Sequence, residues 1–99
     1  MSSNKQGITS AYLDEICSVL CQIQDTDQMR RLLKEILTPA ERKAVALRWE
    51  LMRRLMDGDA QRQIADELGV SLCKITRGVR ILKQTDSVSK QQLLSRRPQ

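Results

Sequence analysis

The sequence predicts an all-α fold of about six helices. Apolar residues recur at helical spacing along most of the chain, residues that start and stop helices separate these stretches, and no alternating strand pattern occurs. A chain of 99 residues has room for one domain, residues 1–99, with a modest core. Because Phe is absent and only Tyr12 and Trp49 are aromatic, that core must be aliphatic. We therefore expect a single domain that associates with a second copy.

Residues 1–37 are predicted to supply two dimerisation helices. The polar segment 1–7 is expected to be frayed, and the first helix follows it with apolar residues at Ile8, Tyr12, Ile16, Val19, Leu20 and Ile23. Asp25 to Asp27 end this helix and can cap a second one. The second helix carries Met29, Leu32, Leu33 and Ile36 on one side, and Leu37 closes it.

A strong helix start follows at Thr38. Thr38 can cap, Pro39 suits the first helical position, and Glu41 can complete a capping box. This third helix is the longest and should stop at Gly58, with its inward residues being Val45, Trp49, Met52, Leu55 and Met56. Near the other end of the chain, Asp86 or Ser87 should cap a last short helix through Leu94.

Residues 61–84 have the pattern of a helix-turn-helix. A short helix from Asp59 or Ala60 to Leu68 is followed by a turn at Gly69, and Ser71 caps a fifth helix to about Lys83. Ala65 is small where the two helices cross, and the wedge between them is Ile64, Leu68, Val70 and Ile75. An ordinary helical hairpin would explain the apolar residues equally well, but it would not require the cations Lys74, Arg77, Arg80 and Lys83.

The charge balance favours double-stranded DNA as a partner. Lys and Arg number 17 against 12 Asp and Glu, a net charge of +5. The amino end of the recognition helix would reach base edges with Ser71, Leu72, Cys73 and Lys74. Lys74 could bond guanine, and Leu72 or Cys73 could touch a thymine methyl. Phosphate contacts are expected from Gln61, Arg62 and Thr76, and Arg80 completes the DNA-binding set. A two-fold dimer would place two such helices roughly 34 Å apart on a palindromic site.

Other functional classes find little support. Without His or a nucleophile or phosphate-loop motif, we expect no enzyme. Cys17 and Cys21 lie four apart, but no His and no fourth ligand accompany them, so we expect no metal site. The odd cysteine count without an export signal indicates reduced thiols in the cytoplasm. No apolar run approaches the roughly 20 residues that span a bilayer, so no membrane association is expected.

One set of motifs, in order along residues 32–83, resembles the tryptophan repressor family. The matching residues are Leu37-Thr38-Pro39, Glu41-Arg42, Arg48, Gly58, Gln61-Arg62, Glu67-Leu68-Gly69 and Ile75-Thr76-Arg77-Gly78. The resemblance implies an intertwined helical homodimer with a helix-turn-helix reading head. It also implies repression from a palindromic operator of tryptophan biosynthesis or transport genes, with L-tryptophan as corepressor and no other cofactor.

The resemblance further implies a ligand site between the third helix and the recognition helix. Arg48 and Arg77 would flank the indole ring, and Arg77 and Thr38 would meet the carboxylate. Carbonyls at the end of the second helix, around Glu35 and Leu37, would receive the ammonium group. Gly78 would leave room for the ring; the alternative is that it merely permits close helix packing.

Three departures from the family pattern leave alternatives open. Ile81 stands where tryptophan-binding members tend to carry Ser, and Lys74 replaces a small hydroxyl residue. The link between Gly58 and Gln61 is one residue shorter than usual, with Asp59 available as cap. Ile81 allows a repressor of the same fold with no ligand or with another ligand. A protein-protein adaptor built from the same helices is the remaining alternative.

Overall fold

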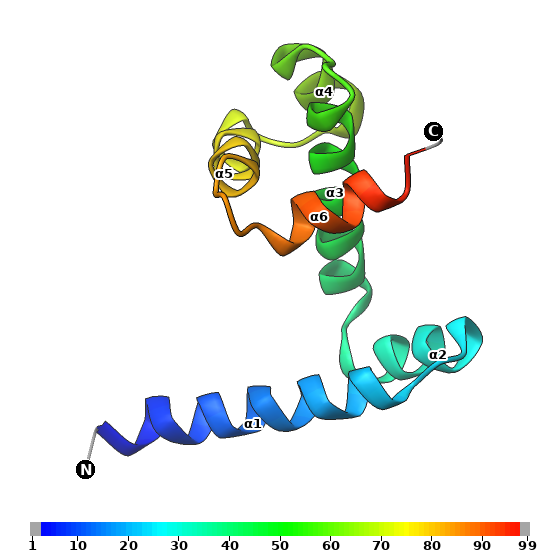
Figure 1. Ribbon diagram of the computed structural model, residues 1–99, viewed down its shortest axis with the longest axis vertical. Coiled ribbons are helices and arrows are strands. Elements are labelled where there is room, and N and C mark those ends of the chain that lie inside the picture. Colours follow the sequence, from blue (N-terminus) through cyan, green and yellow to red (C-terminus); the bar gives the residue numbers. More distant parts are fainter. Residues whose placement is uncertain (1–2, 98–99) are drawn as a thin grey trace. The chain divides into compact units, whose positions relative to one another are not determined.

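The computed structural model describes residues 3–97, which form helices and no strands (Figure 1). The six helices are α1 (Ser3–Gln22), α2 (Thr26–Ile36), α3 (Pro39–Met56), α4 (Gln61–Leu68), α5 (Leu72–Leu82) and α6 (Val88–Ser95). The predicted all-α fold is confirmed. The chain divides into two compact units, one up to Pro39 and one from Ala40 onward.

The N-terminal unit contains α1 and α2. Helix α1 already begins at Ser3, so the prediction that the whole segment 1–7 is frayed was wrong, and only residues 1–2 of that segment lie outside the described range. Lys5 and Gln6 are good helix formers, which lets the helix extend beyond its apolar stretch. Asp25 caps α2 as predicted, since its Oδ1 accepts a hydrogen bond of 3.3 Å from the Asp27 backbone N–H.

The N-terminal unit has no core of its own. None of residues 6–39 is buried. Several large apolar side chains are instead exposed: Ile8, Tyr12, Leu13, Val19 and Ile36. The N-terminal unit therefore leaves much of its apolar surface uncovered within the single chain.

The C-terminal unit is built around three buried side chains from three helices. Leu51 of α3, Ile64 of α4 and Ile75 of α5 are 2%, 0% and 0% exposed. Partly buried residues pack against them: Met52, Leu55, Ala65, Leu68 and Val70. The predicted wedge of the helix-turn-helix is therefore confirmed, and it fastens α4 and α5 to the second half of α3.

Helix α3 turns inward only part of the predicted set, since Met52 and Leu55 pack against the core and Val45 and Trp49 do not. Val45 and Trp49 are 49% and 36% exposed, so their assignment to the inside was wrong for the single chain. Leu51 is the buried residue of α3. The cause is that α3 carries two apolar faces, one through Leu47, Leu51 and Leu55 and the other through Val45 and Trp49, at about 100° per residue.

The turn after α3 corrects a second prediction. Gly58 has a φ of +87°, the left-handed conformation expected at the end of this helix. Ala60, which offers no side-chain cap, is the N-cap residue of α4. Asp59 does not cap α4, because its Oδ2 accepts a 2.7 Å hydrogen bond from Arg54 Nε.

The remaining boundaries follow local signals. Gly69 has a φ of +65° and ends α4. Ser71 caps α5 through a 3.3 Å hydrogen bond from the Lys74 backbone N–H to its Oγ. Of the two candidate caps for α6, the structure uses Ser87, whose Oγ accepts from the Lys90 N–H at 3.1 Å. Leu93 of α6 is buried, and α6 contacts α5.

Candidate ligand pocket and nucleic-acid interface

The α4–turn–α5 segment has a defined local geometry. The Val70 backbone N–H donates to the carbonyl of Ala65 at 3.1 Å, which closes the turn around Gly69. Ile64 and Ile75 meet in the core on either side of this turn. Because both helices are fastened to α3 by the same cluster, the first turn of α5 is presented by a packed scaffold.

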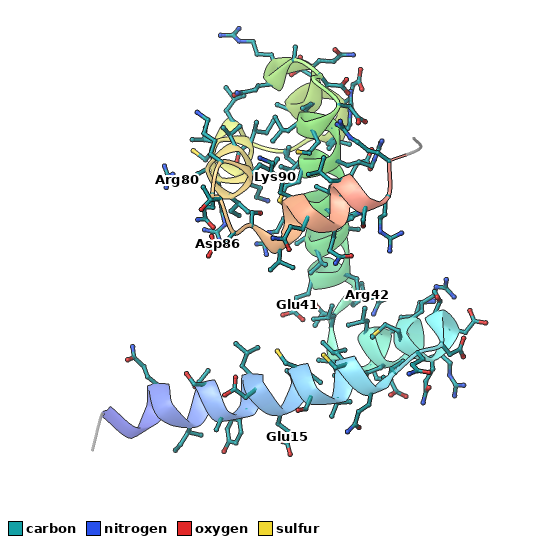
Figure 2. All side chains as sticks on the ribbon, viewed as in Figure 1. Glu15, Glu41, Arg42, Arg80, Asp86 and Lys90 are labelled. Atoms are coloured by element: carbon teal, nitrogen blue, oxygen red, sulfur yellow. The ribbon has the colours of Figure 1, made fainter. Side chains whose placement is uncertain are left out.

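The residues predicted to contact DNA are all exposed. They are Gln61, Arg62, Ser71, Leu72, Cys73, Lys74, Thr76 and Arg80. Leu72 is 49% exposed, although a leucine is normally sheltered in a core. Arg80 lies on the outer side of α5 (Figure 2). These side chains are free to meet a partner, and Arg62 and Arg80 make no ion pair within residues 3–97.

Two hydroxyl groups, one at the N-cap of α5 and one within it, differ in whether their hydrogen is still available for a partner. Ser71 Oγ accepts the Lys74 N–H, which leaves its own hydroxyl hydrogen available to a phosphate oxygen. Thr76 Oγ1 instead donates to the carbonyl of Leu72 at 3.0 Å. A phosphate contact through the Thr76 hydroxyl hydrogen would have to replace that bond, so Ser71 is the better prepared donor.

A cavity of about 160 Å³ lies between α3 and α5. It is lined by Arg48, Leu51, Met52, Lys74, Arg77, Gly78 and Ile81. Four of the six predicted ligand residues, Arg48, Arg77, Gly78 and Ile81, thus come together. Leu51, Met52 and Ile81 supply apolar surface, and a cavity of roughly 150 Å³ accommodates a benzene-sized ring.

Helix α5 packs closely against side chains of α3 at Gly78. A Cβ built on Gly78 would lie 2.6 Å from Leu51 Cδ1 and 3.3 Å from Leu55 Cδ1. A distance of 2.6 Å is far below the contact distance of two carbon atoms. A larger residue at position 78 would force Leu51 to shift, so glycine suits this close packing, and the cavity lies beside the contact.

A comparison with protein families matches a model described as Trp repressor protein to residues 11–97. The chain belongs to this family. A Trp operon repressor homolog of Chlamydia trachomatis serovar L2 is 36% identical over 87 residues, which covers 87% of this chain and 88% of the relative. Homologs of the same description from Xylella fastidiosa strain M23 and Vibrio parahaemolyticus are 35% and 34% identical, covering 72% and 80% of this chain and 78% of each relative.

Membership of the Trp repressor family establishes the general role of the chain. The family is a regulatory DNA-binding family and not an enzymatic one, and the chain has a role as a transcriptional repressor. Within residues 3–97, no helix has the length and apolar character needed to cross a membrane. The same residues contain no cluster of three or more potential metal-ligating His, Cys, Asp or Glu side chains.

The remaining two predicted ligand residues lie in the other unit. Leu37 ends α2, where its backbone N–H donates to the carbonyl of Leu33 at 2.8 Å. Thr38 precedes the first residue of α3. Neither is among the residues that line the cavity, so their contact with a ligand stays a prediction.

Sequence reasoning missed an ionic clamp that holds α4 against the end of α3. Arg54, whose side chain is 12% exposed, lies 2.7 Å from Asp59 Oδ2 and 2.7 Å from Glu67 Oε2. A hydrogen bond from Gln63, and then the Arg54 guanidinium, hold the pKa of the Glu67 carboxyl below its usual value. The available signal was an Arg near the end of one helix with one carboxylate in the following turn and another in the next helix, a pattern too common to be informative.

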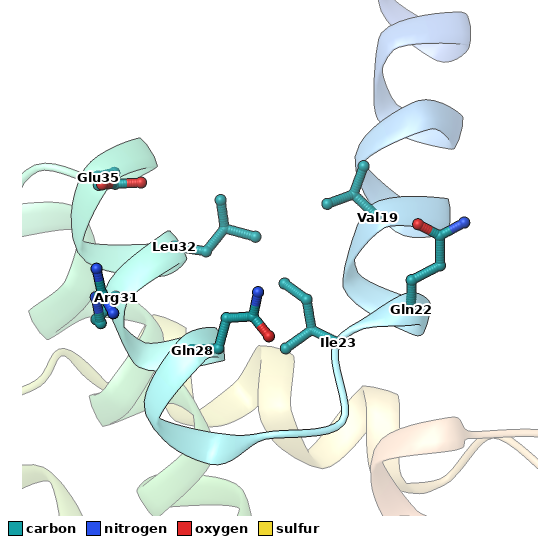
Figure 3. Close-up of a pocket in the computed structure, with 7 residues that line it drawn as sticks. All are labelled: Val19, Gln22, Ile23, Gln28, Arg31, Leu32 and Glu35. Atoms are coloured by element: carbon teal, nitrogen blue, oxygen red, sulfur yellow. The ribbon is translucent and has the colours of Figure 1, made fainter.

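A second, larger hollow lies within the N-terminal unit. It measures about 580 Å³ and is formed by α1, α2 and the turn between them. Val19 of α1 and Leu32 of α2 point toward one another across it, with Ile23 of the connecting turn between them (Figure 3). Arg31 and Glu35 complete its α2 side. The apolar side chains at the centre of this hollow are uncovered within the single chain, as are the other exposed apolar residues of this unit.

Proposed function

We propose that this chain is a homodimeric, tryptophan-responsive repressor that binds a palindromic operator of tryptophan biosynthesis or transport genes. L-Tryptophan occupies the cavity between α3 and α5 as corepressor, and the helix-turn-helix of residues 61–84 reads the operator. The observation that carries the proposal is the cavity, which is built partly from the recognition helix itself. A ligand there touches the element that reads DNA.

The chemistry of the cavity suits an indole ring with a carboxylate. Arg48 of α3 and Arg77 of α5 both line it, and planar guanidinium groups stack on aromatic faces. The apolar side chains of Leu51, Met52 and Ile81 suit the ring. The relatives are described as Trp operon repressor homologs, which supports tryptophan-related genes as the target of this chain.

The dimer is supported by the apolar surface that the N-terminal unit leaves exposed. Residues 6–39 bury no side chain, and the hollow between α1 and α2 is apolar at its centre. Burying apolar surface stabilises the folded state by about 25 cal/mol per Å². A second copy that covers this surface therefore adds substantially to the free energy of unfolding. We expect unfolding temperatures to rise with protein concentration. Sedimentation of a folded monomer at micromolar concentration would contradict the dimer.

The decisive test is operator affinity with and without L-tryptophan. A duplex is first selected from a random-sequence library in the presence of L-tryptophan, so that the selection itself identifies the operator sequence. Its affinity is then measured in both conditions at one salt concentration, because protein-DNA affinity depends steeply on salt. Coupling of about 1–3 kcal/mol predicts roughly 5- to 150-fold tighter binding with ligand.

A repressor of the same fold with another ligand or none remains the second candidate, and Gly78 is the observation that favours it. Leu51 lies so close to Gly78 that packing alone explains the glycine, whether or not a ring enters the cavity. Equal operator affinity with and without L-tryptophan would select this candidate. Failure to enrich any duplex would leave the protein-protein adaptor.

A further inference from the structure

The face of α5 that carries Lys74 is the cavity face. Lys74, Gly78 and Ile81 are spaced by four and three residues, so they lie along one side of the helix. All three line the cavity, and Arg77 does so beside them. Thr76 and Arg80 are two and six residues from Lys74, which at about 100° per residue places them on the opposite side of α5.

The cavity has an unbalanced charge. Three cations line it, Arg48, Lys74 and Arg77, and no carboxylate does. Within residues 3–97 none of these three cations forms an ion pair, whereas Arg53 and Arg54 on α3 each bind two carboxylates. Like charges gathered around apolar surface repel one another, and an anionic ligand group relieves that repulsion.

We propose that Lys74 is a ligand-binding residue, whose ammonium group pairs with the carboxylate of the aromatic ligand in the α3–α5 cavity. This inference rests on the proposed function, because it concerns the same cavity. The main role of Lys74 is then ligand binding, whereas the sequence alone predicts that Lys74 contacts a DNA base. The ligand class is an aromatic carboxylate, and the carboxylate is the group that Lys74 recognises.

Two ligands and three proteins test this assignment by calorimetric titration. At about pH 6, where both α-amino groups are protonated, L-tryptophan and L-tryptophan amide share the ring and the ammonium group and differ in the carboxylate. The proteins are the full-length wild type, Lys74→Met and the control Lys83→Met, since Lys83 is exposed at the end of α5 and does not line the cavity. We expect Lys74→Met to weaken L-tryptophan binding by roughly three- to tenfold, as a partly exposed charge pair would.

The amide distinguishes charge recognition from a general effect on the cavity. Its affinity should change by less than about twofold in Lys74→Met, and Lys83→Met should bind both ligands like the wild type. Lys74→Arg, which keeps the charge, should retain most of the preference for the acid. In ligand-free operator binding, Lys74→Met should lose no more affinity than Lys83→Met.

Results that differ from these expectations contradict either the role of Lys74 or the tryptophan response. Equal loss of both ligands in Lys74→Met, or no loss of either, removes the pairing with the carboxylate while leaving the proposed function intact. A ligand-free operator defect much larger in Lys74→Met than in Lys83→Met returns Lys74 to base reading. If the wild type binds neither ligand, the proposed tryptophan response itself falls, and the role of Lys74 falls with it.

Discussion

Gly78 of α5 lies directly against Leu51 of α3, since a Cβ built on the glycine would lie only 2.6 Å from Cδ1 of the leucine. Leu51 is 2% exposed, and an added Cβ on Gly78 would displace its side chain within the buried cluster or toward the cavity. The contact joins the core of the C-terminal unit to the wall of the ligand cavity, which both residues line.

The effect of Gly78→Ala should therefore depend on Leu51. Overpacking costs about 1–3 kcal/mol, while replacing a helical glycine by alanine gains about 0.5–1 kcal/mol, so the substitution should destabilise the wild type. In a Leu51→Ala background the clash is removed, and the same substitution should become stabilising. Denaturant unfolding of the four proteins at one concentration measures this coupling. Gly7→Ala is the control, because a Cβ there meets nothing within 4 Å and should only stabilise.

Arg48→Ala should reduce the response to L-tryptophan without impairing the reading head. Arg48 lines the cavity from α3 and lies outside residues 61–84. Losing one stacking partner should cut the coupling between ligand and operator by about two- to fivefold, which corresponds to about 0.5–1 kcal/mol for an exposed cation and ring. Operator affinity with and without saturating L-tryptophan is the measurement. Lys43→Ala, also exposed on α3 but outside the cavity, should respond like the wild type.

Arg62 and Leu72 should affect DNA binding in different ways. Arg62→Ala should weaken the selected operator and unrelated DNA alike and reduce the salt slope by about 1, because phosphate contacts carry no sequence information. Leu72→Ala should weaken the operator and leave unrelated DNA nearly unchanged, because an exposed apolar side chain offers no charge to phosphates. Titrations of both duplexes over a range of salt test this. A loss confined to the operator in Arg62→Ala would argue against its role as a phosphate contact.

The Arg54 clamp should make stability depend on pH through Glu67. The Gln63 hydrogen bond and the Arg54 guanidinium hold the Glu67 pKa below its usual value of 4.5. A lowered carboxyl pKa in the folded state contributes stability above the usual value, and this contribution is lost as the pH falls through the folded-state pKa. Glu67→Gln should therefore show a smaller fall in unfolding temperature on acidification below about pH 4.5 than the wild type. Asp66→Asn, an exposed neighbour that makes no ion pair within residues 3–97, serves as control.

The helix boundaries and the wedge of the reading head follow from the sequence because they rest on local signals. Asp25, Ser71 and Gly69 act on backbone groups within a few residues, so their effects can be predicted without knowing the tertiary structure. Ile64 and Ile75 lie close in sequence on either side of a turn, which restricts their partners to one another and α3. The ordered motifs from Leu37 to Gly78 likewise indicated the family.

Only the tertiary structure decided which face of α3 the reading head covers. Val45 and Leu51 belong to two apolar faces of similar strength, and periodicity alone cannot rank them. The same holds for Lys74 and Arg54, because a position on a helix leaves open whether a charge meets solvent, a cavity or a carboxylate of another helix. Those outcomes depend on how α3, α4 and α5 cross. The crossing is set by the packing of Leu51, Ile64 and Ile75 together with the close contact at Gly78, and such contacts between distant residues leave no local pattern in the sequence.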